Sequence, residues 1–381
     1  MDMAQAFFGF GGSFLSYLIP FLFVLTIVVF FHELGHFWVA RRCGVKIEAF
    51  SIGFGPELFG FNDRHGTRWK LSAVPLGGYV RFHGDESAAS TPDTAALAKM
   101  DEAEKRVAFF HQPVSKRAAI VAAGPIANFI LAIVIFSLVF MIFGRQVTTA
   151  RVDNIQPGSA AAEAGFQPGD LVLSIDGRKI ENFGDMQRIV SASPGVTLNV
   201  IVDRDGREVS LQATPKLQEF KDNFGNTHRV GMLGISRSTT REDIVTERFG
   251  PLTAVQLGVA ETWFVLERTL SYVGGLITGR EATDQLGGPI RIAQISGQVA
   301  GVSFAALLHL TAVLSISIGL LNLFPIPLLD GGHLVFYAIE AIRGKPLSER
   351  AQEYGFRLGL ALVLMLMLFA TWNDILHLTR L

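Results

Sequence analysis

Four stretches of the chain are apolar and long enough to cross a lipid bilayer, which takes about 20 residues in a helix. They lie at about 14–40, 118–143, 303–324 and 354–372. Lys116 and Arg117 precede the second stretch and Arg145 follows it. The fourth stretch is short, but Arg357 near its start can extend its charged end to the interface. The pattern therefore predicts a multi-pass α-helical membrane protein with about four transmembrane helices.

Basic residues near the ends of these stretches predict the orientation, because cytoplasmic connections carry an excess of Lys and Arg. No basic residue precedes the first stretch, whereas Arg41 and Arg42 follow it directly. Arg343 and Lys345 lie in the connection between the third and fourth stretches. We therefore expect both connections in the cytoplasm and the long segment 145–301 outside, which in a bacterium is the periplasm.

The outer segment has a different pattern over 148–240. Short apolar runs alternate with turn signals such as Asp176-Gly177 and Asp205-Gly206, and two short helical patterns lie near 160–164 and 183–192. Such spacing is typical of a small α+β domain.

The next segment, 241–302, contains an apolar stretch at 251–279 that is interrupted by Glu261, Glu267 and Arg268. These charges predict an amphipathic helix lying in the membrane interface. A helix packed on the α+β domain is the alternative. The remaining parts, 1–147 and 303–381, form the two halves of one membrane core.

Composition narrows the function further. The net charge is −1 with 49% hydrophobic residues, and no basic block is present, so we expect no nucleic-acid partner. The single cysteine, Cys43, excludes an intrachain disulfide and a cysteine zinc cluster.

No basic segment precedes the first apolar stretch and no small-residue cleavage site follows it, so we interpret it as a retained span. The polar segment 87–104 is expected to be a mobile connector.

The strongest chemical signal is His32-Glu33-Leu34-Gly35-His36 at the end of the first stretch. Residues four apart share a helix face, so both imidazoles can bind one zinc ion with Glu33 beside them. Ionisable groups at membrane depth are costly and usually functional. The pattern therefore predicts a metal centre within the bilayer.

Zinc needs a third protein ligand, and Asp330 is the leading candidate. It ends a stretch without Asp, Glu, Lys or Arg, after Pro325 and Pro327 have broken the third helix. The first and third helices enter the membrane from the same side, so Asp330 lies at the same end as the two histidines. His333 is an open alternative, whereas His309 lies roughly 30 Å farther along a helix. A simple turn role for Asp330 is the other interpretation.

The order of motifs resembles the site-2 proteases, specifically the bacterial regulator-of-sigma-E protease type. The resemblance is carried by the HExxH sequence, the run Asn322 to Gly332, Pro75 to Val80, and a domain containing Gly165-Phe166-Gln167-Pro168-Gly169-Asp170, which is similar to PDZ domains. It covers nearly the whole chain. Several family members carry two PDZ domains, whereas this chain has room for one.

The resemblance implies a role for each matched residue. His32, His36 and Asp330 would bind Zn²⁺, and Glu33 would be the catalytic general base. A membrane-associated β-hairpin at about 45–83 would pair with an unwound substrate. The implied substrate-binding residues are Asn322, Pro325, Pro327, Gly77, Gly78 and Tyr79, with Leu233, Gly234 and Ile235 in the PDZ domain, on an expected strand 231–235.

The function implied is an intramembrane zinc endopeptidase of the bacterial inner membrane, with a periplasmic PDZ domain and an active site toward the cytoplasm. Its partners would be the lipid bilayer and single-span membrane proteins, of the anti-sigma-factor or remnant signal-peptide type, already cut by an upstream site-1 type protease. Two other hypotheses are a PDZ scaffold with an inert metal site and a metal transporter. Whether Asn128 serves the site or only joins two helices stays open.

Overall fold

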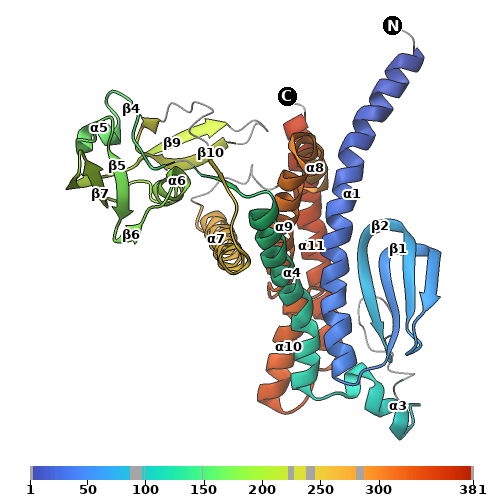
Figure 1. Ribbon diagram of the computed structural model, residues 1–381. Helices are drawn as coiled ribbons and strands as arrows, with labels where there is room; N and C mark the ends of the chain where they lie inside the picture. The colour runs from blue at the N-terminus through green and yellow to red at the C-terminus, as the bar shows by residue number, and fades with distance from the viewer. Residues whose placement is uncertain are drawn as a thin grey trace. The chain divides into compact units, whose positions relative to one another are not determined.

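The computed structural model describes residues 3–85, 97, 99–147, 149–221, 227–236, 245–279 and 287–378. These residues form two compact units (Figure 1). The first combines Met1–Val139 with Pro251–Arg380, and the second is Phe140–Gly250. The chain thus leaves the first unit, builds the second, and returns.

Four helices of the first unit are long and apolar enough to cross a membrane. They are α1 (Met3–Arg42), α4 (Val114–Ile142), α9 (Phe304–Asn322) and α11 (Glu349–Leu378). The described part of the chain therefore has the helices of a multi-pass membrane protein. α1 and α11 are longer than the predicted stretches at 14–40 and 354–372.

Close backbone packing joins α1 to α4. A Cβ added at Gly35 of α1 would lie 2.3 Å from the carbonyl oxygen of Ala123 in α4. Small residues allow membrane helices to approach in this way, since apolar side chains gain little by leaving lipid. Gly35 lies between the two histidines of the HExxH sequence. The close approach of α4 therefore occurs at the turn of α1 that carries these histidines.

The predicted interfacial segment contains two helices, α7 (Pro251–Ile277) and α8 (Pro289–Val302). α7 packs against α9, and α8 packs against α1, α9 and α11. The buried carboxylate of Asp374 in α11 accepts hydrogen bonds from the backbone N–H groups of Gly288, Ile290 and Arg291. These donors have no partner within the first turn of a helix, so Asp374 caps α8 and fixes it to α11.

Two long strands follow α1 and form a sheet that folds back on itself. β1 (Ile47–Asn62) and β2 (Arg68–Phe82) are antiparallel, and Phe50 is paired with both Trp69 and Val80. The lateral order of segments is therefore 59–62, 68–71, 47–52 and 78–82, which leaves 78–82 at one edge. Asp63, at the β1–β2 turn, binds Arg41 at the end of α1 with a distance of 2.5 Å.

The chain between this sheet and α4 includes a short helix, α3 (Glu102–Val107), and a 3₁₀ turn, η1 (Phe109–His111). Asp101 and Glu104 form a capping box at the start of α3. Part of the connector predicted at 87–104 is therefore helical. Residues 87–96 and 98 of that connector lie outside the described residues.

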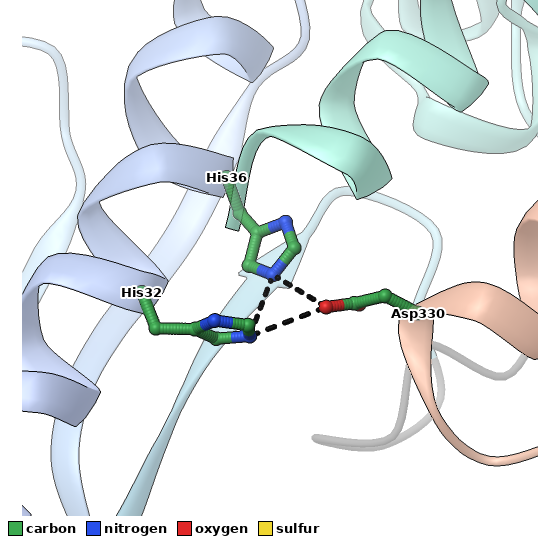
Figure 2. Close-up of side chains that lie close together, drawn as sticks. All are labelled: His32, His36 and Asp330. Carbon is green, nitrogen blue, oxygen red and sulfur yellow. Dashed lines mark hydrogen bonds and ion pairs between the residues drawn. The ribbon is translucent and has the colours of Figure 1, made fainter. Parts of the chain in front are cut away.

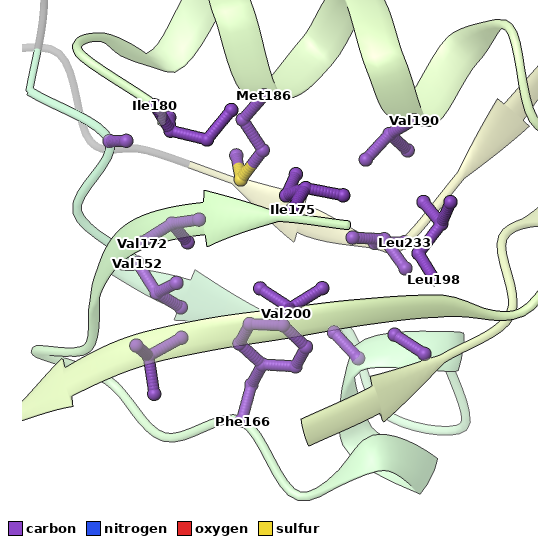
Figure 3. Close-up of a cluster of buried hydrophobic side chains, with 14 of the residues drawn as sticks. Val152, Phe166, Val172, Ile175, Ile180, Met186, Val190, Leu198, Val200 and Leu233 are labelled. Atoms are coloured by element: carbon purple, nitrogen blue, oxygen red, sulfur yellow. The ribbon is translucent and has the colours of Figure 1, made fainter. Parts of the chain in front are cut away.

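The second unit is an α+β domain with a four-stranded sheet in the order β6-β5-β7-β8. Its main elements are β5 (Leu171–Ile175), β6 (Arg178–Lys179), β7 (Leu198–Arg204), β8 (Arg207–Ala213), α5 (Ala160–Ala164) and α6 (Phe183–Ser191). Its smaller strands are β3 (Arg145–Val147), β4 (Asn154–Ile155), β9 (Lys216–Lys221), β10 (Thr227–Met232), β11 (Ile235–Ser236) and β12 (Val245–Glu247). Every second residue of β7 from Leu198 to Val202 lies in one core, together with Val172 and Ile175 of β5, Met186 of α6 and Phe166 (Figure 3).

The prediction of one strand over 231–235 is wrong. Residues up to Met232 belong to β10 and pair with β9, whereas Ile235 in β11 pairs with Ile155 in β4. Gly234 has φ of +77°, which is incompatible with a continuous strand, and the chain turns there. The side chain of Leu233 lies in the core of the domain.

Candidate metal centre

The helical geometry of α1 places His32 and His36 on one face, one turn apart. Their Nε2 atoms lie 3.3 Å from each other, and both side chains are largely buried. His36 Nδ1 is 2.8 Å from the carbonyl oxygen of Ile120 in α4, and Asn128 of α4 lies beside His32 Nδ1. The Nδ1 atoms thus face α4, and the Nε2 atoms face a common point.

Asp330 reaches that point from α10 (Asp330–Arg343), far along the sequence. α9 ends at Asn322 because Pro325 and Pro327 cannot continue its hydrogen bonding, and the chain reverses before α10. Gly331 permits the tight turn, since a Cβ there would lie 2.3 Å from the carbonyl oxygens of Leu323 and Phe324. The reversal puts Asp330 at the start of α10 and next to α1.

The three side chains converge (Figure 2). Asp330 Oδ2 lies 3.2 Å from His32 Nε2 and 3.6 Å from His36 Nε2. Among the described residues, this buried oxygen has no hydrogen-bond partner. Two imidazole nitrogens and a carboxylate oxygen directed at one point match the ligand types of zinc and leave its fourth position for water. These residues fit a zinc ion.

A cavity of about 200 Å³ adjoins the group. Glu33 lines it together with the three converging residues, and so do Gly78 and Tyr79 of β2 and Asn322 at the end of α9. A Cβ added at Gly78 would lie 3.1 Å from Glu33 Cγ, so the edge of the sheet is in contact with the helix that carries Glu33. The base candidate, the converging residues and the edge of the sheet thus line one cavity.

Two further histidines lie outside the converging group. His333 lines the cavity without joining the three residues. Burial lowers the pKa of His333 below the ordinary value of histidine. His309 packs against the ring of Phe136, with centroids 5.0 Å apart.

Several of the predicted substrate-binding residues are not part of the cavity lining. Gly77, Pro325 and Pro327 do not line it. Pro327 packs on α11, where a Cβ at Gly359 would collide with its carbonyl oxygen. Leu233, Gly234 and Ile235 belong to the second unit, as described above.

Sequence reasoning did not assign a role to Gly124, which lies directly against the imidazoles. A Cβ there would lie 2.2 Å from His36 Nε2 and 2.9 Å from His32 Cε1. The available signal was the pair Gly124-Pro125 inside an apolar helix, because two residues unfavourable to helices need a packing or functional reason.

Comparison with known proteins agrees with this chemistry. The model of the family described as Peptidase family M50 matches residues 20–366. A putative zinc metalloprotease of Agrobacterium fabrum is 52% identical over 364 residues, covering 96% of this chain and 97% of the relative. Metalloprotease MmpA of Caulobacter vibrioides is 44% identical, covering 95% and 96%.

A more distant relative is the regulator of sigma-E protease RseP of Escherichia coli, 32% identical over 459 residues, with 95% of this chain and 99% of the relative covered. The name of the Agrobacterium relative includes zinc, and the members of peptidase family M50 depend on this metal. The family match extends from the first spanning helix into the last, and so includes the HExxH sequence and Asp330. On this basis the chain belongs to peptidase family M50, the site-2 protease family, and is a zinc metalloprotease.

Proposed function

We propose that the protein is an intramembrane zinc endopeptidase that hydrolyses peptide bonds within the transmembrane segments of single-span proteins. The observation that carries this proposal is the convergence of His32, His36 and Asp330 beside Glu33, with both histidines in a helix of membrane-spanning length. An inert scaffold or a metal transporter would have no use for the base next to the ligands.

In this proposal His32, His36 and Asp330 hold the zinc ion. When bound, zinc polarises the scissile carbonyl and lowers the pKa of bound water toward about 7. Glu33, which follows the first ligand directly and lines the cavity, accepts a proton from the attacking water and delivers it to the leaving amine. A carboxylate in this position serves as base and then as acid without moving away from the cavity.

The edge segment 78–82 is proposed to hold the substrate. A helical peptide has its carbonyl groups engaged in hydrogen bonds, so hydrolysis requires an extended chain, and a strand edge binds such a chain through its backbone. Gly78 and Tyr79 lie at this edge and Asn322 faces the same cavity, where its amide can bind the substrate backbone. The sheet also exposes Leu58 and Phe59, at 69% and 66%, which supports its association with lipid.

The second unit is proposed to be a single periplasmic PDZ domain that screens substrates. Its α+β architecture and its buried core support this assignment. Because Leu233 is 4% exposed, we assign it the role of holding the backbone near Gly234 and Ile235, and assign the contact with a peptide to that backbone. The test is a full-length variant with substitutions at 233–235. If this variant cleaves substrates that still carry their outer domain, the PDZ domain normally excludes such substrates. If the variant no longer cleaves any substrate, the domain recruits them.

The name of the Escherichia coli relative supports a place in regulated proteolysis. We propose the bacterial inner membrane as the location, with the cavity open to the cytoplasm. The substrates would be anti-sigma factors or remnant signal peptides that an upstream protease has already shortened. α7, which exposes Leu252 and Trp263 at 75% and 66%, would lie in the membrane interface.

The test uses purified protein in detergent with a single-span substrate whose outer domain has been removed. We expect cleavage within the apolar segment, its loss on zinc chelation, and its return when zinc is added. A Glu33→Gln variant should bind zinc without cutting. Cleavage that persists in the chelated protein, or in this variant at the normal rate, would contradict the proposal.

A further inference from the structure

Asn128 lies on α4 at the level of the metal centre and is completely buried. Its side-chain Nδ2 is 3.3 Å from Nδ1 of His32, and among the described residues its Oδ1 has no hydrogen-bond partner. We propose that Asn128 is a positioning residue for zinc: its amide oxygen accepts the Nδ1–H of His32 and holds the ring with Nε2 toward the metal. This inference rests on the metal site proposed above.

The protonation of His32 decides which amide atom faces it. An imidazole that binds metal through Nε2 carries its hydrogen on Nδ1, so Nδ1 is a donor and needs an acceptor. The oxygen and nitrogen of an Asn amide exchange places by a half-turn of the side chain, and the hydrogen-bond network decides between them. Before the half-turn, the Nδ2–H of Asn128 and the Nδ1–H of His32 are two donors that face each other. After it, Oδ1 of Asn128 accepts the hydrogen bond from Nδ1–H and so has a partner.

His36 has the same kind of support from the same helix. Its Nδ1–H donates to the carbonyl oxygen of Ile120, at 2.8 Å. Ile120, Gly124 and Asn128 are spaced four residues apart and so share one face of α4. Gly124, between the two acceptors, leaves the space in which the imidazoles lie. This face of α4 therefore supplies one acceptor for each histidine.

A purely structural role for Asn128 would be a side-chain link between helices. α4 and α9 are indeed joined here, but through the backbone, because the Ser315 hydroxyl donates to the carbonyl oxygen of Asn128 at 2.9 Å. This bond remains when the side chain at position 128 is replaced. Ser315 is itself completely buried, so removing its hydroxyl tests the helix contact without changing the acceptor for His32.

The experiment measures the zinc affinity of the full-length protein in detergent by competition with a chromophoric chelator. Asn128→Leu and the smaller Asn128→Ala remove the acceptor, Asn128→Asp retains one, and Ser315→Ala is the matched control. We expect the dissociation constant for zinc to rise about 10- to 100-fold in the first two variants, the range typical of lost support to a metal-binding histidine. Asn128→Asp should bind zinc at least as tightly as the unaltered protein, and Ser315→Ala should lower only the unfolding temperature.

A spectroscopic measurement separates positioning from general loosening. The visible absorption of Co²⁺ bound in place of zinc should change in Asn128→Ala and remain unchanged in Ser315→Ala. Unaltered zinc affinity in both Asn128→Leu and Asn128→Ala, or an equal loss in Ser315→Ala, would overturn the inference. His32→Ala identifies which proposal fails: if it also binds zinc normally, the metal site itself is wrong, whereas its loss of zinc leaves only the role of Asn128 refuted.

Discussion

Replacing Gly124 with alanine should weaken zinc binding while the protein still folds. The new methyl carbon would lie 2.2 Å from His36 Nε2, whereas non-bonded carbon contacts are about 3.5–4.0 Å. The imidazole ring must therefore move by more than about 1 Å. Metal–ligand distances tolerate deviations of only about 0.2 Å, so the displaced ring cannot keep its bond to zinc in the same geometry.

The size of the effect follows from the cost of inserting a methyl group into a packed interior, about 1–3 kcal/mol. If this cost falls on the bound state, the dissociation constant for zinc rises about 5- to 150-fold, since 1.4 kcal/mol is a factor of ten. The movement is available to His36 because Nε2 is at the end of its side chain. Folding should consequently be affected less than metal binding.

The assay is chelator competition on the purified protein, with the unfolding temperature measured on the same samples. Gly274→Ala is the matched control, because no atom lies within 4 Å of a Cβ built at that position of α7. It makes the same chemical change in a helix without a collision. If Gly124→Ala binds zinc as tightly as the Gly274→Ala control, the imidazoles do not occupy the positions described, and the reasoning fails.

Three other predictions concern individual carboxylates. Glu33→Gln should lower turnover by about 100- to 10,000-fold with zinc content unchanged, as measured by peptide cleavage and metal analysis; a loss of zinc would instead make Glu33 a structural residue. Asp330→Asn should bind zinc more weakly, whereas His333→Ala should keep normal affinity; the reverse order would exchange their roles. Asp170 is buried, which alone raises its pKa, but hydrogen bonds from Arg204 and a backbone N–H lower the pKa below its ordinary value. Its stabilising effect should therefore be complete above about pH 4, the ordinary pKa of Asp, and decline as the pH falls further; hydrogen exchange across 150–213 should show this decline, and Asp170→Asn should show a flatter dependence.

Much of the membrane unit follows from local sequence. Apolar stretches of sufficient length predict the spanning helices. The two prolines after α9 predict that this helix stops there, and Asp330, the first charged residue after them, is then expected just beyond its end. Both inferences rest on the high cost of exposing polar groups to lipid, which leaves a sequence few alternatives. The convergence of Asp330 with the two histidines required the additional assumption that their helices enter the membrane from the same side.

Contacts that depend on backbone approach were not predictable in this way. Nothing in the local pattern of β1 and β2 indicates that Phe50 pairs twice, because each strand bends where glycines such as Gly53 adopt positive φ. The break at Gly234 has the same origin. The position of Gly124 against His36 depends on how two helices cross, which hydrophobic periodicity does not determine.

The distribution of the three converging residues along the chain has a consequence for biosynthesis. Two come from α1 and the third from α10, separated by about 300 residues that a ribosome, at about 5–20 residues per second, needs on the order of 15–60 s to add. During that interval the nascent chain already has both imidazoles in its first helix and still lacks the carboxylate. A peptidase assembled in this order is inactive while the first three of its four spanning helices are being inserted, because all of them precede Asp330 in the chain.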